Sequence, residues 1–271
     1  MHLIAVDLDH TALDNLYELN DVTAEALKKL KALGHRVIIA TARPSCLTMP
    51  HYERLGLDTT AVLCNGADLV NLSGTGPDPQ TRYLSINKLD RVLSLFPTGI
   101  IDNLGLERDD DLYIYGDMSE SPYHMELIKQ SNTHDIDIHD IPRMDVGRVF
   151  LRIRDIPEAT EIIGDLAKTE GISFYYRKVA GKRKQLYISI QSLLANKWFG
   201  IAEAAEYYGI ARENIITFGD EFNDEMMLEE AGLGFVMKNG NEELKKQVGN
   251  ITRYTNVEGG VGKELIRLFN L

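Results

Sequence analysis

The sequence predicts an α/β protein in which a parallel sheet flanked by helices is interrupted by an inserted α+β domain. Its first apolar run, residues 3–6, ends in two acids one residue apart, Asp7 and Asp9. Strand-like and helix-like stretches then alternate, which is typical of parallel sheets because each crossover between parallel strands usually contains a helix. Residues 75–80, rich in Gly, Pro and Asp, mark a boundary, after which the pattern changes.

The first strand is expected at residues 3–6, where Leu, Ile, Ala and Val make both faces apolar. Such a run is typical of a strand buried in the middle of a parallel sheet. Asp7 and Asp9 follow it and point the same way, because alternate side chains of a strand share a face. Ligands of open α/β sheets bind beyond the carboxyl ends of the strands. The alternative is that one acid caps a turn and the other is solvated.

Two further strands of the core are expected at residues 37–40 and 61–64. A helix begins near Asn20 and Asp21, carries an apolar stripe and stops at Gly34. The second strand ends in Thr41-Ala42-Arg43, and the third in Asn65. Right-handed helical crossovers are the economical connection between such strands.

The inserted domain is expected at residues 81–185, leaving 1–80 and 186–271 to the core. Strands with the pattern of this domain are predicted at 112–115, 149–153 and 172–176, with one more at 186–190, just beyond its expected end. Its helices are predicted at 86–95, 123–131 and 157–170. Apolar and polar residues alternate in several of these strands, which predicts an antiparallel sheet with one covered face. The core then resumes with a helix from about 196 to 208, strands at 215–219, 232–237 and 251–254, and helices at 242–248 and 262–269.

Composition narrows the class of partner. The chain has 271 residues, 44% of them apolar, and a net charge of -12, which argues against binding a nucleic-acid backbone. The only two cysteines, Cys46 and Cys64, have no metal spacing, which favours a reducing compartment. The first strand follows Met1 too closely for a signal peptide, and no apolar run approaches the roughly 20 residues of a membrane span. We therefore expect a cytoplasmic protein, as a monomer or small homo-oligomer.

Polar residues end several of the expected core strands: Asp7, Asp9, Thr41, Asn65, Asp220 and Asn239. In a parallel sheet these ends share one edge, so the side chains can converge. Asp7 and Asp220, with Asp224 and the backbone carbonyl of Asp9, would then form a Mg²⁺ site, since magnesium prefers oxygen ligands. Glu221, Glu225, Glu229 and Glu230 are better explained as a solvated helix face.

Two other residues allow a structural and a functional explanation. Lys197 begins a helix, where a lysine opposes the macrodipole, so it is either a surface residue or the counter-ion of an anionic pocket. Thr41 is either an N-cap or a donor to a phosphoryl oxygen.

The motif Asp7-Leu8-Asp9-His10-Thr11 resembles the D-x-D-x-T signature of the haloacid dehalogenase superfamily of phosphohydrolases. Thr41 and Lys197 match its second and third motifs, and residues 219–224, Gly-Asp-Glu-Phe-Asn-Asp, resemble its fourth. Residues 65–67, Asn239 and residues 256–261 are similar to the Cof-like branch, which has a large α/β cap. His10 stands where glycine is commonest, and Ala42 replaces a usual glycine. The resemblance covers the whole chain and implies a Rossmann-like core with an inserted cap.

The resemblance implies a Mg²⁺-dependent phosphatase acting on a small phosphomonoester, such as a sugar phosphate, through an aspartyl-phosphate. Asp7 would be the nucleophile and Asp9 the general acid and base, while Lys197 would neutralise charge. The remaining expected roles are phosphate or substrate binding by Thr41, Ala42, Asn65 and Asn223, and metal binding by Asp7, Asp9, Asp220 and Asp224.

Two alternatives remain open: a phosphomutase of the same fold, and a non-catalytic protein that binds a phosphorylated metabolite. The cap is expected to select among substrates. Its basic cluster, made of Arg177, Lys178, Lys182, Arg183 and Lys184, is either a solvated hairpin tip or a substrate contact.

Overall fold

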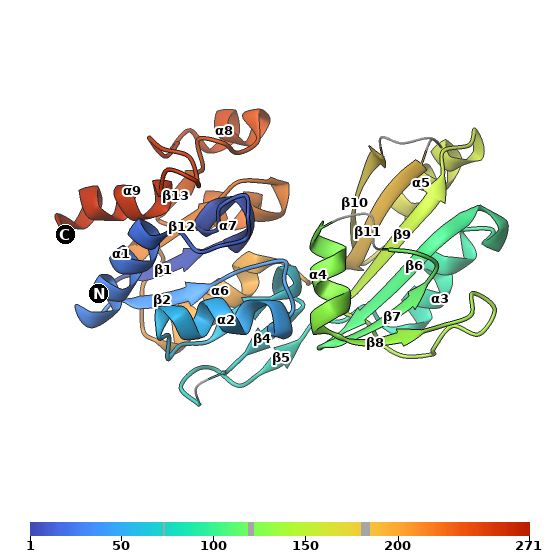
Figure 1. Cartoon of the computed structure of the whole chain (residues 1–271), viewed down its shortest axis with the longest axis horizontal. Helices are drawn as coiled ribbons and strands as arrows, with labels where there is room; N and C mark the ends of the chain where they lie inside the picture. Colours follow the sequence, from blue (N-terminus) through green and yellow to red (C-terminus); the bar gives the residue numbers. More distant parts are fainter. Residues whose placement is uncertain (73, 119–121, 180–184) are drawn as a thin grey trace. The chain divides into compact units, whose positions relative to one another are not determined.

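The computed structural model describes residues 1–72, 74–118, 122–179 and 185–271 (Figure 1). The chain divides into two compact units. The first, the core, comprises residues 1–43, 48–80 and 196–271, and the second, the cap, comprises residues 44–47 and 81–195. The predicted α/β class, a parallel core sheet with an inserted domain, is confirmed.

The return from the cap to the core falls at residue 196, ten residues later than the position expected from the sequence. The reason is β11 (Gln185–Ser192), which pairs with β9 (Arg148–Arg154) and β10 (Ile172–Val179) of the cap. Residues 44–47 also group with the cap, where the Cys46 N–H donates to the Asp110 carboxylate at 2.8 Å.

The core is built on four parallel strands in the order β13 (Leu233–Val236), β12 (Ile215–Gly219), β1 (Leu3–Val6) and β2 (Arg36–Ile39). The expected third strand, β3 (Ala61–Leu63), joins β2 only through a parallel bridge between Ala40 and Val62. It pairs antiparallel with β4 (Asp68–Val70), which lies beside β5 (Gln80–Thr81). The strand expected at 251–254 is reduced to one bridge between Val236 and Ile251.

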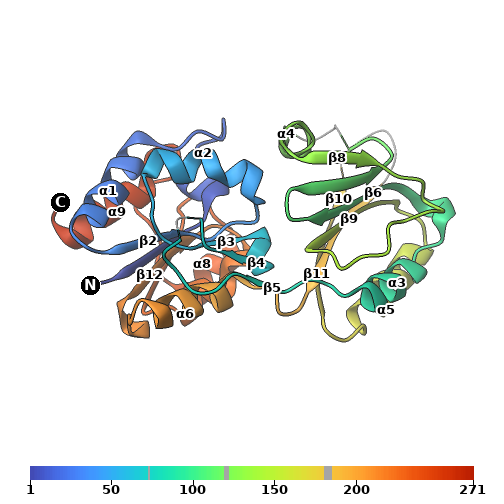
Figure 2. The same ribbon diagram turned by 90° about the horizontal axis from the view of Figure 1, so that it is seen from below.

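Helices cover both faces of the core sheet (Figure 2). Ile4 and Val6 of β1 pack with α1 (Asp21–Ala32), α2 (Ser45–Leu55) and α9 (Gly260–Phe269). Leu3 and Ala5 face the other way, toward α6 (Lys197–Tyr207), α7 (Glu225–Glu230) and α8 (Glu242–Val248). All of β1 is buried, as its two apolar faces predict.

The cap sheet has the order β10, β11, β9, β6 (Ile101–Arg108), β7 (Asp111–Tyr115) and β8 (Asn132–Asp135). Its pairs are antiparallel except β7 with β8, so the expected wholly antiparallel sheet is wrong at this edge. Helix α4 (Pro122–Gln130) lies between these two strands in the chain. It forms the crossover that brings the chain back to the end of the sheet where β7 begins, so that β8 can run parallel to β7.

The two faces of the cap sheet differ in chemistry. Leu104, Leu151 and Ile188 lie on the apolar face and pack with α3 (Ile86–Ser94) and α5 (Glu158–Ala167). The opposite face carries Leu112 and Phe150, which pack with α4. We call its remaining part, made of Arg148, Arg152, Arg177 and Tyr187, the polar face of the cap. Across the described ranges of the chain, no helix is long and apolar enough to cross a membrane.

Candidate active site

The turn after β1 delivers Asp7 and Asp9 to the end of the core sheet. It spans η1 (Leu8–Ala12), and the Ala12 N–H donates to the Asp7 carbonyl at 3.2 Å. His10 lies at φ +56°, in the left-handed region that glycine adopts without strain. Its carbonyl accepts a bond from Asn239 Nδ2 at 2.8 Å, so the predicted residue Asn239, which follows β13, fixes the turn.

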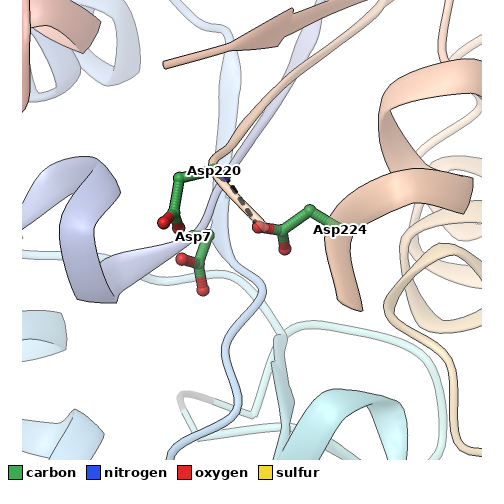
Figure 3. Close-up of side chains that lie close together, drawn as sticks. All are labelled: Asp7, Asp220 and Asp224. Carbon is green, nitrogen blue, oxygen red and sulfur yellow. Dashed lines mark hydrogen bonds between the residues drawn. The ribbon is translucent and has the colours of Figure 1, made fainter. Parts of the chain in front are cut away.

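Three carboxylates meet at this edge: those of Asp7, Asp220 and Asp224 (Figure 3). One oxygen from each lies within 4.8 Å of the others. Asp224 accepts bonds from the backbone N–H groups of Asp220 at 2.9 Å and Glu221 at 3.3 Å. Gly219 makes this approach possible, because a Cβ there would lie 2.5 Å from the Asp224 side chain. The predicted convergence of Asp7, Asp220 and Asp224 is therefore observed.

Lys197 is the cation of this cluster. It is the first residue of α6 and has no exposed surface, so it is not the surface lysine that was the alternative. Its Nζ donates to Asp7 Oδ1 at 2.7 Å and to Asp224 Oδ1 at 2.6 Å. One lysine thus faces three carboxylates in the described part of the site.

This imbalance perturbs the acids. Burial raises the pKa of Asp7 to about 7, although Lys197 opposes the change. Burial and the carboxylates of Asp7 and Asp224 raise the pKa of Asp220 to about 9. Burial alone would lower the pKa of Lys197, but the carboxylates of Asp224 and Asp7 outweigh it and raise that pKa. The cluster therefore holds protons where a further cation would replace them.

The donor set fits a hard divalent cation. All three clustered groups are carboxylates, and hard cations such as Mg²⁺ prefer oxygen ligands. Thr11 Oγ1 donates to Asp220 Oδ1 at 3.3 Å and orients that carboxylate. The Asp9 carboxylate does not belong to this cluster. The prediction that Asp9 binds the metal therefore concerns its backbone carbonyl.

The expected phosphate-binding residues form two groups. Thr41 is fully buried after β2, and its Oγ1 accepts a bond from the Arg43 N–H at 3.2 Å, within a bend. Thr41 is not the helix N-cap considered as an alternative, because α2 begins only at Ser45. Ala42 lies in the same bend. Asn223 Nδ2 donates to Asn65 Oδ1 at 3.0 Å, so these two amides lie together. Their phosphate-binding roles stay predictions.

Sequence reasoning missed Arg43. Its guanidinium donates two bonds to the Asp9 carboxylate, from Nε at 2.9 Å and from Nη2 at 2.7 Å, and it has no exposed surface. The available signal was an arginine two residues after a strand end, at an edge already rich in acids.

Only part of the basic cluster of the cap can be described. Lys182, Arg183 and Lys184 lie outside the described residues. The guanidinium carbon of Arg177 lies 5.2 Å from the centre of the Tyr187 ring, and Lys178 Nζ lies 3.7 Å from Asp155 Oδ2. Whether the cluster contacts substrate therefore stays a prediction.

Comparison with known proteins gives consistent matches along the chain. A family model described as haloacid dehalogenase-like hydrolase matches residues 4–265. The 5-amino-6-(5-phospho-D-ribitylamino)uracil phosphatase YitU of Bacillus subtilis (strain 168) is 31% identical over 278 residues, covering 100% of this chain and 98% of that protein. The pyridoxal phosphate phosphatase YbhA of Escherichia coli (strain K12) is 26% identical, covering 90% of each chain. These matches span both units.

Solved structures agree on the fold. The HAD subclass IIB sugar phosphatase BT4131 superposes with a TM-score of 0.76 and 19% identity, covering 100% of this chain and 99% of that one. At this identity the likeness concerns the fold, including an inserted cap.

Proposed function

Because this chain belongs to the haloacid dehalogenase-like hydrolases and is a phosphatase of that superfamily, we propose that it hydrolyses a small phosphomonoester through an aspartyl-phosphate on Asp7. The observation that carries the proposal is the contact of Lys197 with both Asp7 and Asp224 at the end of β1. It brings motifs that are 190 residues apart in the sequence into one site.

We propose Mg²⁺ as the cofactor, held by Asp7, Asp220 and Asp224. The donor set and the raised pKa values of Asp7 and Asp220 support it. When bound, the ion supplies positive charge for the carboxylates and for the transferring phosphoryl group.

Asp7 acts as the nucleophile. A carboxylate oxygen of Asp7 attacks phosphorus, the bond from phosphorus to the ester oxygen breaks, and the leaving alcohol takes a proton from Asp9. Water then attacks the phosphorus of the aspartyl-phosphate and gives a proton to Asp9. The bond from phosphorus to the Asp7 oxygen breaks in this step, so phosphate is released and the Asp7 carboxylate is restored. Lys197 holds Asp7 in place and, together with the Thr41 hydroxyl, offsets the charge of the phosphoryl group.

The substrate is proposed to be a small phosphorylated metabolite. The two relatives are named for phosphate esters of ribitylaminouracil and of pyridoxal, and the structural neighbour for a sugar phosphate. Phosphoryl transfer on the core needs little from the rest of such molecules. We therefore assign discrimination to the cap, with its polar face as the candidate surface.

Turnover of p-nitrophenyl phosphate with Mg²⁺ tests the proposal. Asp7→Asn should lower kcat by at least about a hundredfold, since it removes the nucleophile. The matched control Asp78→Asn changes an exposed aspartate and should behave as wild type. Wild-type turnover by Asp7→Asn, or no effect of a chelator, would contradict the mechanism. A panel of phosphorylated metabolites would then identify the substrate.

A further inference from the structure

Asp9, the residue assigned to proton transfer, is clamped by Arg43. The Nε of Arg43 donates to Asp9 Oδ2 at 2.9 Å, and Nη2 donates to Asp9 Oδ1 at 2.7 Å. Two parallel bonds of this kind fix the plane of a carboxylate as well as its position. The Arg43 side chain has no exposed surface, whereas that of Asp9 is 25% exposed. The arginine is thus the embedded partner and the aspartate the accessible one.

Arg43 is itself held on several sides. Its guanidinium carbon lies 5.1 Å from the centre of the Tyr17 ring, on the hairpin that follows the catalytic turn. Its N–H donates to Thr41 Oγ1 at 3.2 Å, and its carbonyl accepts the Cys64 N–H at 3.1 Å. Because backbone and side chain are both anchored, Arg43 can serve as a fixed support for a neighbour.

His51, whose pKa responds to the charges of Arg43 and Asp9, does not compete with Arg43 as a cation. Burial, with the charge of Arg43, lowers the pKa of His51 to about 4, so His51 is neutral near pH 7. In the described part of the site, Lys197 is committed to Asp7 and Asp224. Arg43 is therefore the cationic group that orients the Asp9 carboxylate.

We infer that Arg43 is a positioning residue for Asp9: it holds the carboxyl group in the orientation from which a proton passes to the leaving oxygen. The inference rests on the proposed function, in which Asp9 is the general acid. Arg43 then acts through Asp9 and not through the phosphoryl group. Its loss should matter only for substrates whose leaving group needs the proton.

Two other roles for Arg43 make different predictions. A purely structural ion pair would, when broken, lower activity on every substrate by the same factor, through the fraction of folded protein. A phosphate ligand would weaken binding of every phosphomonoester alike. Only the positioning role links the size of the effect to the leaving group.

Benzyl phosphate and p-nitrophenyl phosphate separate these roles. Both carry one aromatic ring. The leaving group of benzyl phosphate is an alkoxide that needs a proton, whereas the leaving group of p-nitrophenyl phosphate is p-nitrophenolate, which leaves without one. The measured quantity is kcat/KM, since it covers the steps up to release of the alcohol and excludes hydrolysis of the aspartyl-phosphate.

The variants are Arg43→Met, Arg43→Lys, Asp9→Asn and the double variant Arg43→Met/Asp9→Asn. General acid catalysis contributes about 10²–10⁴-fold, so Asp9→Asn should lose about that much on benzyl phosphate and far less on p-nitrophenyl phosphate. Arg43→Met should lower kcat/KM at least about tenfold on benzyl phosphate and less than about threefold on p-nitrophenyl phosphate. These losses should be smaller than those of Asp9→Asn, because Arg43 only positions the acid. The double variant should match Asp9→Asn within about twofold, because residues that act as a unit are not additive.

Folding is checked by thermal melting, with Arg54→Met on the surface of α2 as the arginine control. If Arg43→Met does not fold, Arg43→Lys carries the test: it keeps the charge, loses one of the two bonds and should show a smaller loss with the same selectivity. Equal losses on both substrates, or a double variant that multiplies the two single effects, would overturn the inference. If Asp9→Asn itself shows no selectivity, the proposed acid role fails as well.

Discussion

Binding of Mg²⁺ to the acidic cluster should release protons, because metal ligands must be deprotonated. At pH 7, Asp7 with a pKa of about 7 is half protonated, and Asp220 with a pKa of about 9 is almost fully protonated. Saturation with Mg²⁺ should therefore release about one and a half protons per chain at pH 7 and about half a proton at pH 9.

The apparent affinity follows from the same count. The logarithm of the binding constant rises with pH by the number of protons released, so affinity should increase about thirtyfold between pH 6.5 and pH 7.5. It should then level off above pH 9, where Asp220 also becomes ionised. Both acids are protonated more in the folded protein than in the unfolded chain, so without metal their contribution to stability falls as pH rises from about 4 to about 9.

Isothermal titration calorimetry in two buffers of different ionisation enthalpy measures the release. Asp220→Asn should lower it by about one proton at pH 7 when Mg²⁺ is saturating, because Asn carries no titrating proton. Asp78→Asn, an exposed control, should leave it unchanged. A release near zero at pH 7, or the same value at pH 7 and pH 9, would refute the electrostatic reasoning, since the cluster would then be ionised without metal.

Two further changes test the roles of Lys197 and the cap. Lys197→Met leaves Asp7 and Asp224 without their shared cation. In urea denaturation, the free energy of unfolding should fall by about 3 kcal/mol at pH 8, and by less at pH 6, where Asp7 takes up a proton. Equal losses at both pH values would contradict this expectation. Arg177→Gln on the polar face of the cap should change kcat/KM unequally among natural phosphate esters and leave p-nitrophenyl phosphate within about twofold. One common factor for all substrates would show that this face does not select.

The catalytic edge of the core was predictable because its signals are local. A strand that is apolar on both faces must be buried, and the acids that follow it must emerge at the sheet edge. Gly219 is also a local signal, because a residue without a side chain there leaves room for the carboxylate of Asp224, four residues beyond Asp220. Convergence of these strand ends then follows from parallel topology.

The cap was less predictable because its strands depend on their neighbours. Strand β6 was missed, since Asp102, Asn103 and Gly105 interrupt its apolar pattern, and its pairing with β9 contains a register shift after Ile101. It forms because β7 and β9 bond to it on both sides, and such tertiary context outweighs local propensity. The same dependence moved the cap boundary: a strand was expected at 186–190, and the pairing of β11 with β9 and β10 extends the cap beyond residue 185.

The contact of Arg43 with Asp9 joins residues 34 apart and leaves no periodic trace in the sequence. Its consequence is electrostatic. A chain with a net charge of -12 binds an anionic ester only if cations face it locally. In the described core, the two cationic side chains that touch the acids of the site are already engaged: Lys197 with Asp7 and Asp224, and Arg43 with Asp9. The acids of the described site therefore outnumber its side-chain cations, which leave little charge for a phosphate dianion. The metal thus has a double role in the proposed function, since it replaces the protons of the cluster and supplies the attraction that draws the phosphoryl group toward Asp7.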